Sequence, residues 1–353
     1  MNLHVLSRRL TGFCAFAILC GGMPGAVANV GRSACPPTDV AARPAPQIAA
    51  TAPDHAVPFT LREGDVVAFL GGEWVVQELE TGHLESLLAA SFPARGVRFC
   101  NLGWEGDTVF EQPRDVNFPG ILEELRRTKA TVAFLQFGGQ ESRAGREGVP
   151  GFVAAYERLC DELIKQTPRL VLVTPPPVDK SSDPPSGRDA RSRNADTALY
   201  AAAVRDLARR RGYPCVDLFS ELGSIEGPAD LLTDHGIPTP RGQARVALAA
   251  AHQLGLAQAA HGGAPAGPDA HWASPEMESL RQAVVAKNRL WFRYHRPTNW
   301  AFLGGDRTSV PSSHDHRDPA VRWFPAEMEQ YLPLIDQAQA RADELARGAT
   351  GAK

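Results

Sequence analysis

Short apolar segments alternate with amphipathic ones through the middle of the chain. Five of the apolar segments have the length of a β-strand, at residues 66–70, 97–102, 131–137, 170–173 and 215–219. Such nearly continuous runs are typical of strands that are buried on both faces, as in a parallel sheet. The intervening and following segments have apolar residues at helical spacing, at about 75–91, 118–128, 150–166, 194–212 and 240–256. The pattern predicts an α/β fold, a three-layer α/β/α sandwich with about five parallel strands and right-handed crossovers.

The two ends of the chain differ from this middle part. Residues 1–28 combine Arg8 and Arg9 with a short apolar run and the small-residue sequence Ala26-Val27-Ala28, which is typical of a cleaved signal peptide. A twin-arginine route and a lipoprotein anchor at Cys20 are open alternatives. We expect an exported protein, periplasmic or extracellular, without a transmembrane segment after cleavage. The remainder divides into an Ala/Pro-rich linker at 29–60, the α/β domain at 61–258 and a C-terminal extension packed on it at 259–353.

Composition narrows the classes of function. Of the 353 residues, 43% are hydrophobic and 22% are charged, which is enough to build a core. The net charge is −3, so no general basic field predicts a nucleic-acid partner. No glycine-rich phosphate-binding pattern follows a strand, which disfavours a nucleotide-binding module. Signal cleavage leaves Cys35, Cys100, Cys160 and Cys215, an even number that permits disulfides, and none of them has zinc-finger spacing.

The residues that follow each strand are the candidates for a site, because ligands of open parallel sheets bind beyond the carboxyl ends of the strands. These segments are Gly71-Gly72-Glu73-Trp74, Asn101 to Thr108, Gly138-Gly139-Gln140-Glu141 and Thr233 to Gly242. In this order they resemble the four sequence blocks of the SGNH (GDSL) hydrolase family, over about residues 63–256. Trp104 and the segment Lys287–Pro297 further resemble a bacterial subgroup with a similar C-terminal extension. The resemblance implies a flavodoxin-like SGNH-hydrolase fold and an esterase ancestry.

The catalytic positions of that family are substituted in this chain. In the family, a serine attacks an ester carbonyl, a histidine oriented by an aspartate takes its proton, and a glycine amide and an asparagine help to hold the oxyanion. The resemblance places Glu73 at the serine, Gln140 at the asparagine, His235 at the aspartate and Pro238 at the histidine. Only the glycine, Gly106, is unchanged. Because proline has no ring nitrogen that accepts a proton, the ordinary serine-hydrolase mechanism is unsupported.

A group of polar residues would nonetheless meet at the strand ends. The group consists of Glu73, Asp107, Glu141, Asp234 and His235. One interpretation is a carboxylate-rich pocket, in which Glu73 or His235 acts as a general acid or base or in which a divalent cation binds. The other is that these residues cap helices and tighten turns. No His-x-x-x-His pairing is present, so we predict neither a dedicated metal site nor a cofactor.

Two further positions support a binding role. Gly106 and Gln140 could together present donors to a carbonyl or carboxylate group. With Asp107 and Glu141, they form the predicted ligand-binding set. Thr108 has the only hydroxyl group in its block, and no evident base lies beside it in the sequence.

The C-terminal extension contains two other candidates. His314 and His316 flank Asp315, either as a metal-binding pair or as a solvated loop. A basic and aromatic cluster spans residues 287–296 and contains Lys287, Arg289, Trp291, Phe292, Arg293, Tyr294, His295 and Arg296. It fits either the binding of phosphate, glycan or acidic polymer or an amphipathic helix that buries its aromatic residues and leaves its basic ones in water.

The sequence therefore supports two hypotheses of function. The first is an exported, catalytically degenerate SGNH-hydrolase-like protein that binds a carbohydrate or ester-type ligand of the cell envelope. The alternative is an active esterase or acetyl-hydrolase with a rearranged site, in which Glu73 or His235 activates water. Both hypotheses have a small molecule or a glycan as the partner.

Overall fold

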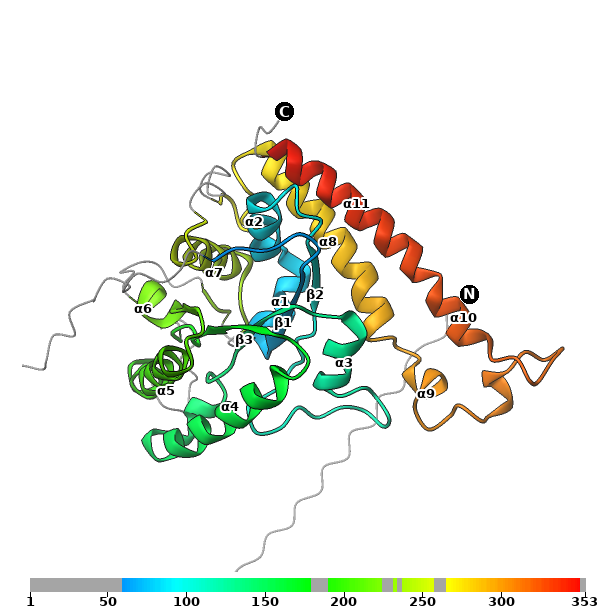
Figure 1. Cartoon of the computed structure of the whole chain (residues 1–353), viewed down its shortest axis with the longest axis horizontal. Helices are drawn as coiled ribbons and strands as arrows, with labels where there is room; N and C mark the ends of the chain where they lie inside the picture. Colours follow the sequence, from blue (N-terminus) through cyan, green and yellow to red (C-terminus); the bar gives the residue numbers. More distant parts are fainter. Residues whose placement is uncertain (1–58, 179–189, 224–230, 234–236, 257–264, 350–353) are drawn as a thin grey trace, which may run out of the picture. The chain divides into compact units, whose positions relative to one another are not determined.

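A five-stranded parallel sheet forms the centre of the protein. The computed structural model describes residues 59–178, 190–223, 231–233, 237–256 and 265–349. The strands are β1 (Val66–Gly71), β2 (Arg98–Asn101), β3 (Val132–Gln136), β4 (Arg169–Val173) and β5 (Cys215–Val216), in the order β2-β1-β3-β4-β5. All neighbouring pairs are parallel. This is the flavodoxin-like strand order, and the predicted α/β fold is confirmed (Figure 1).

Helices cover both faces of the sheet. They are α1 (Glu73–Thr81), α2 (His83–Ser91), α3 (Ile121–Thr128), α4 (Val149–Leu163), α5 (Ala190–Arg211), α6 (Leu218–Gly223), α7 (Pro240–Gln253), α8 (Pro275–His295), α9 (Trp300–Leu303), α10 (Trp323–Glu329) and α11 (Tyr331–Ala349). Alternate residues of each strand enter opposite cores: Val67 and Phe69 pack with α2, α7 and α8, whereas Ala68 and Leu70 pack with α3, α4 and α5. The sheet is therefore the middle of three layers.

One predicted helix is divided in the structure. The predicted helix at 75–91 is interrupted by Gly82, which has φ of +64° and ends α1 while it begins α2. A Cβ atom at Gly82 would lie 3.0 Å from Val284 and Val285 of α8, so the turn also allows close packing. In the C-terminal extension, Gln330 separates α10 from α11, and Pro333 lies in the first turn of α11, where a missing N–H group is tolerated.

Helix α8 covers the edge of the sheet that β2 forms. The Lys287 ammonium donates to the Phe99 carbonyl (3.3 Å), and the Trp291 indole N–H donates to the Asn101 carbonyl (2.9 Å). Because β2 is an edge strand, these carbonyls have no neighbouring strand to accept from on their outer side, and α8 supplies the hydrogen-bond donors. Lys287 is only 1% exposed and forms an ion pair with Glu85 of α2. The interpretation in which the basic residues of this segment stay in water is therefore wrong for Lys287.

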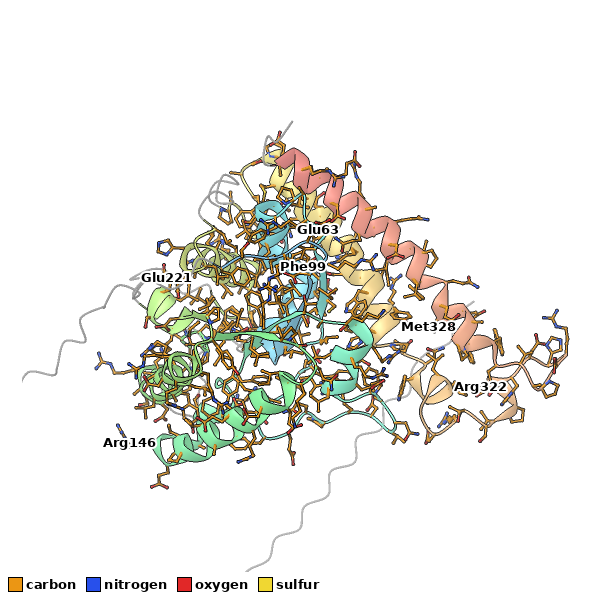
Figure 2. The ribbon with its side chains drawn as sticks, viewed as in Figure 1. Glu63, Phe99, Arg146, Glu221, Arg322 and Met328 are labelled. Carbon is orange, nitrogen blue, oxygen red and sulfur yellow. The ribbon has the colours of Figure 1, made fainter. Side chains whose placement is uncertain are left out.

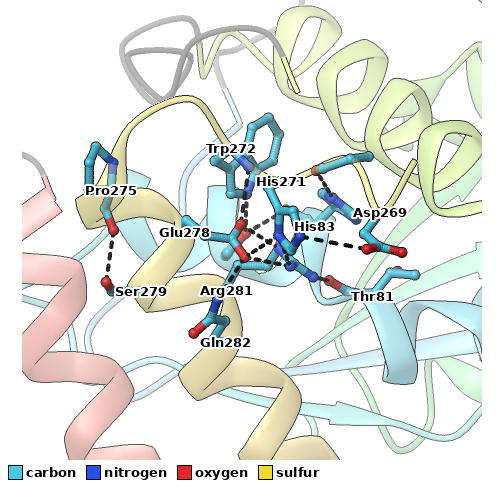
Figure 3. A network of polar contacts seen from close by, with 12 residues as sticks. Thr81, His83, Asp269, His271, Trp272, Pro275, Glu278, Ser279, Arg281 and Gln282 are labelled. Atoms are coloured by element: carbon cyan, nitrogen blue, oxygen red, sulfur yellow. Dashed lines mark hydrogen bonds and ion pairs between the residues drawn. The ribbon is translucent and has the colours of Figure 1, made fainter. Parts of the chain in front are cut away.

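A polar network joins the beginning of α8 to the α1–α2 turn (Figure 3). Arg281 donates to the Thr81 carbonyl (2.8 Å) and pairs with Glu278 (2.6 Å), while Nε2 of His83 lies 2.9 Å from the Ala270 carbonyl. Although burial opposes it, hydrogen bonds from Arg281 and His271 lower the pKa of Glu278 to about 2. The network fixes the first turns of α8 on the domain.

Two other features concern the predicted export and disulfides. No helix within the described ranges combines the length and the apolar composition needed to cross a bilayer. Cys100, Cys160 and Cys215 are free thiols. The predicted signal peptide, the linker up to residue 58 and Cys35 lie outside the described residues.

Candidate functional site

The turn between β1 and α1 packs directly against the loop that follows β2. Trp104 donates its backbone N–H to the Gly71 carbonyl (3.0 Å), and a Cβ atom at Gly72 would lie 3.6 Å from the Asp107 carbonyl oxygen. Gly71 has φ of +150°, and a Cβ atom there would collide with the Gln136 carbonyl of β3. A side chain at position 71 is therefore excluded, and three strand ends come together at this rim.

Glu73 lies at the rim as the first residue of α1. Its side chain is partly exposed, and Oε1 accepts a hydrogen bond from Gln77 Nε2 at 2.9 Å, one helical turn further on. A carboxylate in the first turn is stabilised by the unpaired backbone N–H groups of the helix. Glu73 is therefore available to a ligand as a hydrogen-bond acceptor or a proton acceptor.

Asp107 is buried and makes a two-pronged ion pair. Arg114 Nη1 and Nη2 lie 2.7 and 2.9 Å from its two carboxylate oxygens. Burial raises the pKa of Asp107, and the Arg114 guanidinium only partly offsets this. Arg114 also stacks on the Trp104 ring, at 4.5 Å from the ring centroid. These contacts favour a role for Asp107 in holding the loop after β2.

Glu141 connects the loops that follow β2 and β3. It is buried in a short 3₁₀ turn, and its two oxygens accept backbone hydrogen bonds from Val109 (2.9 Å) and Gly138 (2.8 Å). Burial raises the pKa of this carboxyl group. Both oxygens are engaged inside the protein, so Glu141 positions the adjacent Gln140, whose own side chain is exposed.

The residues predicted as donors lie on the surface of the rim. Gly106 is exposed and has φ of +83°, which suits glycine at the tip of its loop. Thr108 instead caps its own turn, because its hydroxyl oxygen accepts from the N–H groups of Phe110 (3.2 Å) and Glu111 (3.1 Å). Gly106 and Gln140 are therefore both exposed at the rim, where a ligand can reach them.

The loop before α7 reaches the same rim. Pro238 is buried and pairs with Leu232 in an isolated bridge, and the Thr239 side chain caps α7 by accepting from the N–H of Gly242. Gln243 donates to the Trp74 carbonyl of α1 (2.7 Å). Pro238 therefore lies in a buried, bridged position on the loop that leads into α7. Asp234 and His235 lie outside the described residues, so their part in the predicted cluster stays a prediction.

The sequence did not single out a small cavity of about 40 Å³ beneath the rim. Its lining includes Trp74, Glu78, Gln136 and Gln243. Gln136 Nε2 is buried without a hydrogen-bond partner among the described residues. Burial raises the pKa of Glu78 to about 8, while its Oε1 accepts from the N–H of Glu85 (3.0 Å) in the first turn of α2. The feature of the sequence that could have indicated this cavity is Gln136, a polar residue at the end of an apolar strand.

The remaining predicted candidates lie apart from the rim. Asp315 binds the Arg317 guanidinium (3.0 Å), and His316 is 3.6 Å from Asp315 with 88% of its side chain exposed. These contacts suit a solvated loop at Asp315 and His316, whereas His314 is half-buried and its Nδ1 has no hydrogen-bond partner among the described residues. Within the described ranges, no group of three metal-binding side chains is found.

This arrangement agrees with the comparison with known proteins. Residues 69–245, about half of the chain, match the model of the GDSL-like lipase/acylhydrolase family. The protein therefore belongs to the SGNH (GDSL) hydrolase family. No curated protein sequence matches the chain significantly.

Solved structures of similar fold include several esterases. A gut microbial diltiazem-metabolizing enzyme is 13% identical with a TM-score of 0.52, covering 83% of this chain and 96% of that one. The lipase/acylhydrolase from Enterococcus faecalis is 16% identical with a TM-score of 0.41, covering 54% and 95%. A catalytic mutant of the acetylxylan esterase Axe2 from Geobacillus stearothermophilus is 17% identical with a TM-score of 0.40, covering 56% and 97%. At 13% identity, the likeness to the first of these structures concerns the fold alone.

Proposed function

We propose that this protein is an exported, catalytically degenerate member of the SGNH family that binds a carbohydrate or ester-type ligand of the cell envelope. The observation that carries the proposal is the chemistry of two rim residues, Glu73 at the start of α1 and Pro238 in a buried bridge. The sequence resemblance places them where the family has its nucleophile and its base. Neither residue supports formation of an acyl-enzyme.

Recognition of a ligand at the rim remains chemically reasonable. The exposed amide of Gly106 and the exposed side chain of Gln140 offer donors to a carbonyl or hydroxyl oxygen. Glu73 offers an acceptor to a sugar hydroxyl group. In the proposal these three residues contact the ligand, whereas Asp107 and Glu141 hold the loops that carry them.

A second candidate function is hydrolysis of esters or acetylated glycans by a rearranged site. It is favoured by the position of Glu73, whose carboxylate is partly exposed at the strand ends and could activate a water molecule. His235 is the other candidate base. Membership of an acylhydrolase family makes acetyl esters the first substrates to test.

The decisive experiment measures hydrolysis of p-nitrophenyl acetate and acetylated xylo-oligosaccharides by the purified mature protein. We expect rates at the buffer background and no labelling by a fluorophosphonate probe. The matched variants are Glu73→Gln and His235→Asn. Turnover by the parent protein that either variant abolishes would establish the second function and reject the first.

Binding is tested separately with the same oligosaccharides by isothermal titration. We expect Gln140→Ala and Glu73→Gln to weaken binding about tenfold each, the usual effect of losing one good hydrogen bond. Arg143→Ala, an exposed residue in the same 3₁₀ turn, is the control that should leave affinity unchanged. Export is tested by fusing residues 1–40 to a reporter enzyme that is active only outside the cytoplasm.

A further inference from the structure

A second, larger cavity lies beside β2, the strand at one edge of the sheet. It is a groove of about 480 Å³ between α3, α8, α10 and α11, with β2 as its floor. Phe99 and Met328, both labelled in Figure 2, belong to its lining. None of the rim residues lines it. The groove is therefore a separate feature from the candidate site at the strand ends.

The walls of the groove are largely apolar and aromatic. Its apolar lining includes six large side chains: Phe118, Trp291, Trp300, Met328, Leu332 and Ile335. The indole N–H groups of the two tryptophans already donate to the backbone carbonyls of Asn101 and Val116. A ligand therefore meets their rings and not their polar atoms. A concave, mostly apolar cavity of this volume is typical of a site for a small molecule.

The basic groups in the lining each have an acidic partner. Arg127 lies 2.9 Å from Glu124, and Arg98 lies 2.7 Å from Asp336. Lys287 pairs with Glu85. An anionic ligand would have to compete with these pairs, and burying it against them would be costly. The charge pattern thus disfavours an anionic ligand.

His295 provides the specific polar contact. Its Nδ1 lies 3.0 Å from Glu124 Oε2, and both side chains are at most 7% exposed. The ring stacks on Trp291 (5.3 Å between centroids, 9° between planes) and meets Phe118 edge to face. In a neutral imidazole, a carboxylate on Nδ1 favours the tautomer with the proton on that atom, and Nε2 is then an acceptor. A complementary ligand group is a hydroxyl donor.

We propose that this groove binds a small, uncharged ring compound that carries a hydroxyl group. The rings of Trp291, Trp300 and Phe118 contact the ring of the ligand, and His295, oriented by Glu124, accepts its hydroxyl proton in a hydrogen bond. This inference does not depend on the function proposed for the rim.

The test uses 2-naphthol and two matched probes with the mature protein. We expect saturable binding of 2-naphthol with one site per chain by isothermal titration, accompanied by quenching of tryptophan fluorescence. 2-Methoxynaphthalene, which has the same ring system without the donor, should bind about tenfold more weakly, and naphthalene-2-sulfonate should not bind better than 2-naphthol. Absence of saturable binding, equal affinity for the naphthol and its ether, or a preference for the anion would each overturn the proposal.

Three variants test whether the probe binds in the groove. Leu332→Trp adds bulk to a side chain that is 42% exposed at the groove, so it should block binding without loss of folding. His295→Gln should weaken binding of 2-naphthol about tenfold and leave binding of the ether unchanged. Trp323→Ala removes an exposed aromatic residue of α10 that is outside the lining, and it should change neither affinity. Unchanged binding by Leu332→Trp would reject the groove as the site.

Discussion

At the scale of single residues, the same type of side chain plays very different roles along α8. Lys287 is buried, pairs with Glu85 and donates to the edge of the sheet. Arg289, two residues further on, lies 3.6 Å from Glu80, and both of those side chains are 62% exposed. Burial raises the pKa of Glu85, and Lys287 opposes this shift. The two ion pairs should therefore contribute very different amounts to the free energy of unfolding.

This difference is testable by paired substitutions. Lys287→Met should lower the free energy of unfolding by about 3–5 kcal/mol, because it leaves the buried Glu85 carboxylate without its cation. Arg289→Met should change it by less than about 1 kcal/mol, since exposed pairs are screened by water and salt. Urea denaturation at pH 7 gives both values. The double variant Glu85→Gln/Lys287→Met should recover part of the loss, and equal effects of the two single changes would contradict this account.

At the scale of elements, the strands were predictable and the C-terminal contacts were not. The five apolar runs marked the five strands because a doubly covered parallel sheet requires apolar residues on both faces. The strand-end blocks likewise brought Glu73, Gly106 and Gln140 to one end of the sheet. The burial of Lys287 could not be read from the sequence, because its partner Glu85 is 202 residues away. The division at Gly82 likewise depends on the approach of α8.

The docking of α8 on α2 should depend on pH through His83. This side chain is fully buried beside Trp272, and burial lowers its pKa to about 4 from 6.5. The unfolded chain takes up a proton as the pH falls below 6.5, whereas the folded protein does so only near 4. Stability should therefore fall between pH 6.5 and 4, by about 3 kcal/mol for this group.

The measurement compares thermal or urea unfolding of the parent protein and His83→Gln across that pH range. Glutamine can still donate to the Ala270 carbonyl, which His83 contacts at 2.9 Å, but it does not titrate. We expect the difference in stability between the two proteins to shift in favour of the variant as the pH falls. A difference that stays constant from pH 7 to 4 would show that His83 is not kept neutral by the fold.

At the scale of the whole molecule, the protein has the fold of its family, and we propose that the positions that perform the family's chemistry are changed. The β1–α1 turn, the loop after β2 and the 3₁₀ turn after β3 are joined by specific contacts, because Trp104 donates to Gly71 and Val109 donates to Glu141. Gln243, in the first turn of α7, donates to the Trp74 carbonyl of α1. None of these contacts involves the side chain of Glu73, Gln140, His235 or Pro238. If the proposed function is correct, the scaffold should still accept the chemistry of the family.

Replacing the four residues that the resemblance places at catalytic positions tests this directly. The variant Glu73→Ser/Gln140→Asn/His235→Asp/Pro238→His should gain hydrolysis of p-nitrophenyl acetate and become labelled by a fluorophosphonate, because it restores nucleophile, base and oxyanion donor around the retained Gly106. The control carries Glu73→Ala in place of Glu73→Ser, with the other three changes kept. It should neither hydrolyse p-nitrophenyl acetate nor become labelled by the fluorophosphonate. An inactive reverted protein that unfolds like the parent would show that the rim geometry has also diverged. An active parent whose rate falls on reversion would instead establish catalysis by Glu73 or His235.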